Sequence, residues 1–254
     1  MQTLRDWLLE APFSLGLSSG FFGFFAHAGF LSALEEEGLQ PRAAWGSSAG
    51  ALVGGAWAAG LSADEFSRVL FGLRRQDFWD PALGAGLLRG QLFQSILEGV
   101  LPARTFAQCR APLGMSVFDV RTRRTRVLQS GDLATAIRAS CAVPLLFAPV
   151  LIAGRPCLDG GLFDRPGLLG ARPHERILHH HLASSLSWRR RGGPLLDAPR
   201  RAGTISVVLE GLPRVGPFRL SEGVCAHRVA RDATRRILDR PLSGSVLHVP
   251  SAAT

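Results

Sequence analysis

A serine lies at the centre of a short segment that glycines bracket. The segment 46-GSSAG-50 has the pattern G-x-S-x-G, with Ser48 in the middle and Gly46 and Gly50 at the ends. This pattern is typical of a sharp turn from a strand into a helix, in which the serine backbone is strained and the glycines permit a close approach. N–H groups at the start of the helix favour a developing negative charge. Ser48 is therefore predicted to be a nucleophile; the alternative is a serine that only caps the helix.

A nucleophilic serine needs a base, and no histidine is an obvious candidate. Three of the seven histidines are adjacent in 177-ILHHHL-182, where a strand sends neighbours to opposite faces, so they are expected in a sheet or at the surface. His227 and His248 lie late in the chain. They are the candidate bases of one alternative hypothesis, a conventional α/β-hydrolase esterase with a serine, acid and histidine triad.

A carboxylate does lie in a glycine-marked turn. In 157-CLDGGLFDR-165, Asp159 ends a predicted strand and is followed directly by Gly160 and Gly161. This arrangement fixes the carboxylate at a strand end and keeps the backbone slim enough for a second loop to come close. The alternative is an ordinary turn aspartate.

These residues need a scaffold of strands and helices to position them. Residues 13–17 alternate as a short strand, 18–23 form a glycine-bearing turn, and 24–37 have apolar residues at helical spacing. A second strand, turn and helix spans 43–59 around Ser48. The first of these units overlaps an uncharged stretch of 24 residues, 11–34. Its many glycines argue against a membrane span, and the acidic residues before it argue against a signal peptide.

The rest of the chain continues the alternation. Expected helices are 62–73, 92–100, 132–140 and 221–238; expected strands are 113–120, 125–129, 149–153, 157–159, 177–182 and 205–209; expected loops are 77–90 and 189–194. The order predicts an α/β fold with a mostly parallel central sheet, and one domain over residues 1–254.

Composition narrows the class of protein. Hydrophobic residues make up 46% of the chain and charged residues 19%, which favours a large core over disorder. The four cysteines are scattered and no histidine lies at ligand spacing from them, which predicts reduced thiols in a cytoplasmic protein. No calcium-loop or zinc spacing is present, so neither a metal nor another cofactor is expected.

The charge is unevenly distributed. All 29 basic residues are arginines; residues 1–100 carry 6 of them against 10 acidic residues, and residues 101–254 carry 23 against 10. The basic half, and the arginines of 221–238 in particular, favours peripheral contact with an anionic membrane or only a solvated face. No nucleic-acid-binding motif accompanies the charge, so nucleic acid is not an expected partner.

Together the motifs carry a resemblance. The segments FAHAGFLSALEEEGL, GSSAGALVGG, AIRASCAVPLLFAPV and GRPCLDGG, in this order over residues 13–165, resemble the patatin-like phospholipase family of the bacterial type. The resemblance implies a three-layer α/β/α fold and a serine–aspartate dyad in place of a triad. Ser48 would be the nucleophile and Asp159 the general base, acting on a lipid ester or phospholipid.

The chain departs from the family where the oxyanion is bound. Family members usually carry G-G-G-x-[R/K]-G, and this chain has 18-SSGFFG-23. The backbone of Gly20, Phe21, Phe22 and Gly23 is still expected to donate, since the donors are N–H groups. The phenylalanines of this region either pack the first helix or line an acyl-chain cleft or meet a membrane. The departure motivates a further alternative, a catalytically impaired protein that binds anionic lipid surfaces or a partner.

Overall fold

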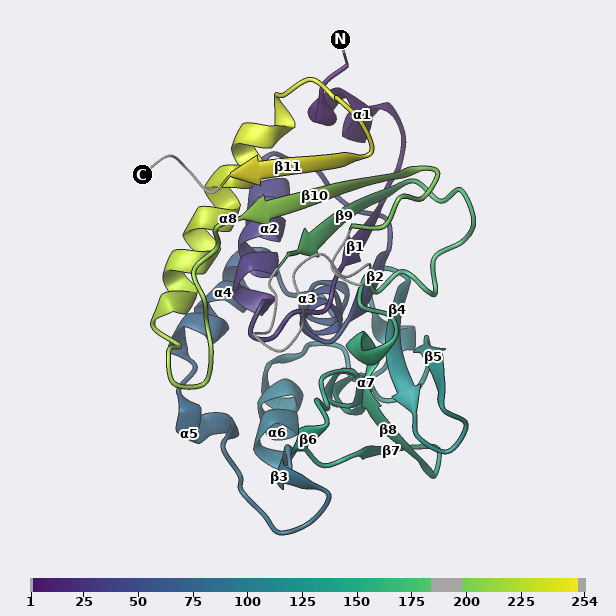
Figure 1. Cartoon of the computed structure of the whole chain (residues 1–254), viewed down its shortest axis with the longest axis vertical. Coiled ribbons are helices and arrows are strands. Elements are labelled where there is room, and N and C mark those ends of the chain that lie inside the picture. The colour runs from purple at the N-terminus through teal and green to yellow at the C-terminus, as the bar shows by residue number, and fades with distance from the viewer. Residues whose placement is uncertain (1, 184–197, 251–254) are drawn as a thin grey trace.

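The computed structural model describes residues 2–183 and 198–250 (Figure 1). Its helices are α1 Leu4–Glu10, α2 Phe24–Glu36, α3 Ala49–Ala58, α4 Ala63–Gly72, α5 Arg75–Phe78, α6 Gln91–Val100, α7 Leu133–Ser140 and α8 Glu222–Leu238. Its strands are β1 Ser14–Leu17, β2 Ala44–Ser47, β3 Gly86–Leu88, β4 Leu113–Asp119, β5 Arg124–Leu128, β6 Leu145–Phe147, β7 Val150–Ile152, β8 Arg155–Asp159, β9 Ile177–Leu182, β10 Thr204–Glu210 and β11 Val246–Pro250.

A mostly parallel sheet forms the centre of the molecule. Its order is β11-β10-β9-β1-β2-β4-β8-β7, with β5 also paired to β4. The strands from β11 to β4 run parallel, whereas β5 and β8 run antiparallel to β4, and β7 runs antiparallel to β8. Every residue of β1, β2 and β9 is buried, as expected for parallel strands that helices cover on both faces. The predicted α/β class with a mostly parallel sheet is confirmed.

The helices begin and end where their capping residues indicate. Ser62 accepts a hydrogen bond from the N–H of Glu65 while the Glu65 carboxylate accepts from the N–H of Ser62, so α4 starts in a capping box. The carboxylate of Asp132 accepts from the N–H of Thr135 at the start of α7. Helix α2 packs closely on α8: a Cβ at Gly29 would lie 2.1 Å from the carbonyl oxygen of His227.

Some elements were not predicted from the sequence. Helix α1 and strand β11 went unpredicted, and the expected loop 77–90 contains the end of α5 and strand β3, which pairs with β6 in a small second sheet. The predicted loop 189–194 lies outside the described residues. One large hydrophobic cluster extends from Leu4 to Val249. This shared core supports the proposal that residues 1–254 form a single domain. None of the helices in the described ranges is both long and apolar enough to cross a membrane.

Candidate active site

Ser48 lies on a strained turn between β2 and α3. Its φ of 54° and ψ of −117° are unfavourable for a residue with a side chain. The flanking glycines are required by close backbone contacts: a Cβ at Gly46 would lie 2.6 Å from Gly50, and a Cβ at Gly50 would lie 2.1 Å from the carbonyl oxygen of Leu17. The G-x-S-x-G spacing thus permits the sharp turn on which Ser48 lies.

Asp159, the last residue of β8, faces Ser48. The Ser48 hydroxyl donates a hydrogen bond to Asp159 Oδ2 over 2.6 Å, and the N–H of Gly161 donates to Asp159 Oδ1 over 2.7 Å. Ser48 is 8% exposed and Asp159 5% exposed. The predicted role of the two glycines after Asp159 has a physical basis, since a Cβ at Gly160 would lie 2.0 Å from the carbonyl oxygen of Ser116.

Two residues at the end of α7 hold the backbone of Ser48. The N–H of Ser48 donates to Ser140 Oγ over 2.9 Å, and Ser140 Oγ in turn donates to the carbonyl oxygen of Ser116 on β4. The thiol of Cys141 contacts the carbonyl oxygen of Ser48 at 3.2 Å. Burial, and then the Asp159 carboxylate, raise the pKa of Cys141 well above its usual value, so the thiol stays neutral. We did not single out Ser140 or Cys141 as site residues, although both lie in the segment AIRASCAVP that carries the resemblance.

Gly20, Phe21, Phe22 and Ala49, whose backbone N–H groups are candidate donors, line the same pocket as Ser48. The N–H groups of Gly20, Phe21 and Phe22 have no acceptor among the described residues, and the start of α3 has no side-chain cap. The N–H of Gly23 is engaged, because it donates to the carbonyl oxygen of Gly20 over 2.9 Å. Gly23 therefore shapes the loop while its own N–H is committed to the turn.

The side chains of Leu182 and His27 contact the loop that carries these N–H groups. A Cβ at Gly20 or at Gly23 would lie 2.5 or 2.2 Å from Leu182 Cδ1, so a larger residue at either position would force the Leu182 side chain to shift. The fully buried His27 places Nε2 2.8 Å from the carbonyl oxygen of Ser18, and its Nδ1 lies 2.9 Å from Nδ1 of His180. Burial lowers the pKa of His27 to about 4, so the ring is neutral at pH 7.

An apolar pocket opens beside Ser48. It encloses about 990 Å³ of empty space, counting its open mouth, and Ser48 and Cys141 are the polar side chains among the described residues that line it, apart from the indole of Trp79. Gly20, Phe21 and Phe22 line the same space. Its walls come from aliphatic and aromatic side chains of α3, α4, α5, α6 and β6. Part of the expected acyl-chain lining, Phe21, Phe22 and Phe24, does line this pocket.

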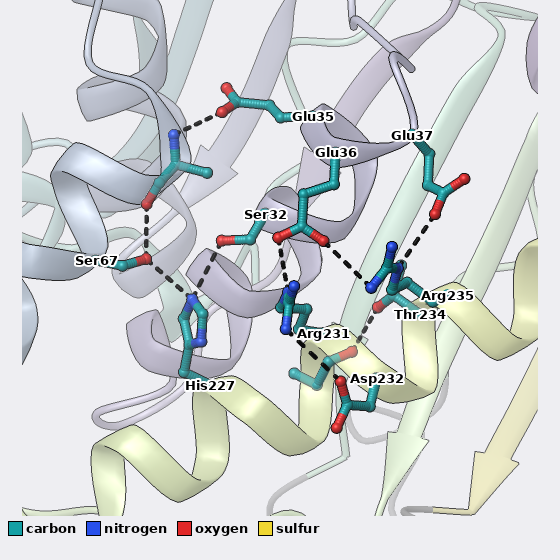
Figure 2. Close-up of polar contacts among 12 residues, drawn as sticks. Ser32, Glu35, Glu36, Glu37, Ser67, His227, Arg231, Asp232, Thr234 and Arg235 are labelled. Atoms are coloured by element: carbon teal, nitrogen blue, oxygen red, sulfur yellow. Dashed lines mark hydrogen bonds and ion pairs between the residues drawn. The ribbon is translucent and has the colours of Figure 1, made fainter.

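The histidines proposed as bases for a triad have other partners. Figure 2 shows that His227 Nε2 points at Ser32 Oγ and Ser67 Oγ, at 3.1 and 2.9 Å. His248 pairs with Glu210 at the surface through a 2.8 Å contact. The histidines of β9 are all buried, in a strand as predicted and not at the surface. The triad hypothesis therefore has no support from the described residues.

Several arginines of α8 are engaged within the protein. Arg231 Nε lies 2.7 Å from Glu36 Oε1, and Arg235 Nε lies 3.1 Å from Glu37 Oε1 (Figure 2). These ion pairs join α8 to the end of α2, as part of an interface between the two helices. Such pairs leave less of the α8 charge free for lipid headgroups than the sequence alone suggested.

Comparison with known families agrees with the fold. A model of the family described as "Patatin-like phospholipase" matches residues 15–172. The chain belongs to the patatin-like phospholipase family. Membership of this family supports a lipid hydrolase activity in general.

Individual relatives extend the comparison. Uncharacterised NTE family proteins of Mycobacterium bovis and Mycobacterium tuberculosis are 34% identical to the chain over 155 residues. The match covers 59% of this chain and 43% of each relative, so the chain corresponds to less than half of their length. The crystal structure of VipD from Legionella pneumophila has a TM-score of 0.63 at 15% identity and covers 90% of this chain and 67% of VipD, which shows a shared fold.

Proposed function

We propose that this chain is a serine lipid acyl hydrolase of phospholipase type, which cleaves carboxylic esters of lipids through a Ser48–Asp159 dyad and an acyl-enzyme. The observation that carries the proposal is the 2.6 Å hydrogen bond from Ser48 Oγ to Asp159 Oδ2 at the wall of an apolar pocket. Family membership supports it independently.

In the first step Ser48 Oγ attacks the ester carbonyl carbon. Asp159 Oδ2 accepts the hydroxyl proton as the new C–O bond forms, from a distance suited to general-base catalysis. The N–H of Gly161 fixes the other carboxylate oxygen, so Oδ2 keeps its aim at the nucleophile. Collapse of the tetrahedral intermediate then releases the alcohol, which takes the proton from Asp159, and leaves the acyl group on Ser48.

The negative charge on the carbonyl oxygen needs donors in place before the reaction. The N–H groups of Gly20, Phe21 and Phe22, together with that of Ala49 at the start of α3, border the pocket and are our candidates for this role. Fixed N–H groups in a site that excludes water stabilise such a charge strongly, and loss of one donor costs roughly 10²–10³-fold in rate in known examples. The loop therefore supplies donors despite its altered glycine pattern.

The second step uses the same two side chains with water. Asp159 accepts a proton from a water molecule that attacks the acyl carbon, and Ser48 leaves with its proton restored from the carboxyl group. The proposed chemistry needs only side chains and N–H groups of this chain. The apolar pocket fits the acyl chain of the substrate. A cytoplasmic location and peripheral contact with an anionic membrane are part of this proposal.

Activity-based labelling tests the proposal. A fluorophosphonate probe should label the wild-type protein at Ser48, as peptide mass spectrometry can show, and a panel of lipid esters should be hydrolysed. Absence of both labelling and hydrolysis in the folded protein would favour the alternative, a catalytically impaired protein that binds lipid surfaces or a partner. That alternative is not favoured by the site, where nucleophile, carboxylate and N–H groups lie together.

A further inference from the structure

Large apolar side chains are exposed around the mouth of the Ser48 pocket. Leu145 is 86% exposed and Phe218 72% exposed; Leu83, Leu87 and Phe21 are exposed as well. Single exposed apolar residues are common in proteins, but a group around one apolar opening marks a site of interaction. We refer to these five residues as the mouth surface.

The mouth surface lies on the segments that build the pocket wall. Leu87 and Leu145 are on the paired strands β3 and β6, whose neighbours Leu88 and Phe147 line the pocket. Phe218 follows the pocket residue Pro217 and packs edge-on against Trp79 of the wall, with ring centroids 5.9 Å apart. In Figure 1, α5, β3 and β6 lie in the lower part of the molecule, and the loop before α8 descends to a point just above α5.

Leu145 occupies a backbone conformation that does not suit leucine. Its φ is 68°, in the left-handed region that glycine and asparagine tolerate better. Neither backbone preference nor burial explains a leucine at this position, because the side chain projects into solvent. A strained, exposed apolar residue at the entrance of a pocket indicates an external apolar surface that it meets.

Arginines accompany the apolar side chains. Five exposed arginines lie in the segments 74–92 and 211–222 that border the mouth, namely Arg74, Arg75, Arg89, Arg214 and Arg219, against the three carboxylates Asp77, Asp80 and Glu222, a net of +2.

Two of these carboxylates are engaged by backbone N–H groups nearby in the chain. The Asp77 carboxylate accepts from the N–H of Arg74, and Asp80 accepts from the N–H groups that begin α6. The guanidinium of Arg75 lies 5.0 Å from the centroid of the Phe218 ring, so charge and apolar surface adjoin. Exposed arginines beside protruding apolar side chains fit an anionic lipid surface.

We propose that the mouth surface docks on an anionic phospholipid bilayer and brings the pocket directly over the lipid. Leu83, Leu87, Leu145 and Phe218 insert among the acyl chains, and the neighbouring arginines contact the headgroups. An acyl chain can then pass from the bilayer into the pocket and reach Ser48 without crossing water. The proposal rests on the proposed function in that it takes a lipid as the substrate. The paired arginines of α8, Arg231 and Arg235, lie outside this contact.

The test compares binding to two kinds of vesicle. The wild-type chain should co-sediment with vesicles of phosphatidylcholine and phosphatidylglycerol, and less with phosphatidylcholine alone. The double variant L145N/F218S should bind the anionic vesicles at least about tenfold more weakly, since each full burial of such a side chain is worth that much or more. Asparagine at position 145 also tolerates the left-handed backbone, so the variant should remain folded by circular dichroism.

A matched control places the same kind of change elsewhere. Leu9 is 67% exposed on α1, at the opposite end of the molecule from β3 in Figure 1, and L9Q should leave vesicle binding unchanged. For charge, R75Q/R89Q should reduce binding to anionic vesicles more than R228Q/R236Q, which removes two exposed arginines from α8. The proposal would be overturned if L145N/F218S and L9Q lost vesicle binding equally, or if R75Q/R89Q and R228Q/R236Q did. Undiminished binding of L145N/F218S would overturn it as well.

Hydrolysis of a soluble short-chain ester separates docking from catalysis. In L145N/F218S the ratio of vesicle hydrolysis to soluble-ester hydrolysis should fall. A wild-type chain that binds anionic vesicles but hydrolyses neither substrate would contradict the proposed function and leave the docking surface standing. A wild-type chain that hydrolyses the soluble ester but binds no vesicle would contradict the docking surface alone.

Discussion

The Ser48 hydroxyl donates to Asp159 Oδ2 over 2.6 Å, although 111 positions of chain separate the two residues. Strand β4 makes the link, because β2 pairs with its residues 113–116 and β8 pairs with residues 117–119, which follow directly. Ser47 lies opposite Ser116, and Asp159 lies opposite the next residue, Val117. The sheet register thus fixes the separation of nucleophile and carboxylate, and small changes in either loop should leave it intact.

The first prediction concerns the Ser48 hydroxyl. S48A should lower ester hydrolysis by about 10⁴-fold or more, because the covalent step has no nucleophile, and should abolish fluorophosphonate labelling. The rest of the fold loses one hydrogen bond, so the free energy of unfolding should change by about 1 kcal/mol. Steady-state kinetics and urea unfolding measure the two effects.

The neighbouring serine provides the control. Ser47 is equally buried, and its Oγ has no hydrogen-bond partner among the described residues. Its removal should therefore be close to neutral for stability, and S47A should retain labelling and hydrolysis. Loss of labelling in S47A with retention in S48A would show that the nucleophile had been assigned to the wrong serine.

The second prediction separates two buried aspartates. D159N should lower hydrolysis by about 10²–10⁴-fold, because an amide cannot accept the serine proton, while its oxygen still accepts from Gly161. D164N should instead destabilise the protein by about 1–3 kcal/mol, since Asp164 accepts hydrogen bonds from Ser116 Oγ and from the N–H groups of Gly167 and Leu168. If D159N keeps full activity, the dyad hypothesis fails.

How far the sequence predicted this site depends on how local each signal is. Ser48 and Asp159 were predicted because each lies in a short turn, and the glycines that each turn requires are its close neighbours in the sequence. Ser140 and Cys141 contact Ser48 across 92 and 93 positions, and nothing near them in the chain indicates that contact.

Whether a signal is local in the sequence also decides which helices and strands were predicted. Helix α4 was predicted because its capping box lies within four residues. Strand β3 was not, because its three residues are held by pairing with β6, almost 60 positions later. Strand β11 likewise depends on parallel pairing with β10, so its short sequence has no distinguishing pattern of its own.

The third prediction tests the turn that carries Ser48. G50A would place a Cβ 2.1 Å from the carbonyl oxygen of Leu17, which is backbone and cannot move aside cheaply. The variant should lose about 1–3 kcal/mol of stability and most of its activity as Ser48 shifts. G99A is the matched change in open space: nothing lies within 4 Å, and alanine in the last turn of α6 should leave the stability unchanged or raise it slightly. Thermal unfolding should show G50A to be less stable than the wild type and G99A to be at least as stable, and kinetics should show a loss of activity in G50A alone. Similar behaviour of the two variants would contradict the close contact.

The fourth prediction follows from the buried histidines. Burial lowers the pKa of His27 to about 4 and that of His179 to about 3, below the ordinary value of 6.5. Between these values the unfolded chain binds a proton that the folded chain does not, so stability rises with pH in this window and falls as the pH drops below 6.5. Each histidine should contribute a slope of about 1.4 kcal/mol per pH unit.

The window from pH 6.5 to 5 isolates this effect, because most carboxylates remain ionised there. Urea unfolding at steps across it should show a steep loss of stability in the wild-type chain. H179Q should reduce the slope by about 1.4 kcal/mol per pH unit, because glutamine does not titrate while its amide, which takes about the place of His179 Nε2, can donate to the carbonyl oxygen of Pro166. A wild-type stability that does not change across the window would show that the buried histidines are hydrated or charged in the folded state. The contacts of His27 with Ser18 and His180, which support the Gly20–Phe22 loop, would then need another explanation.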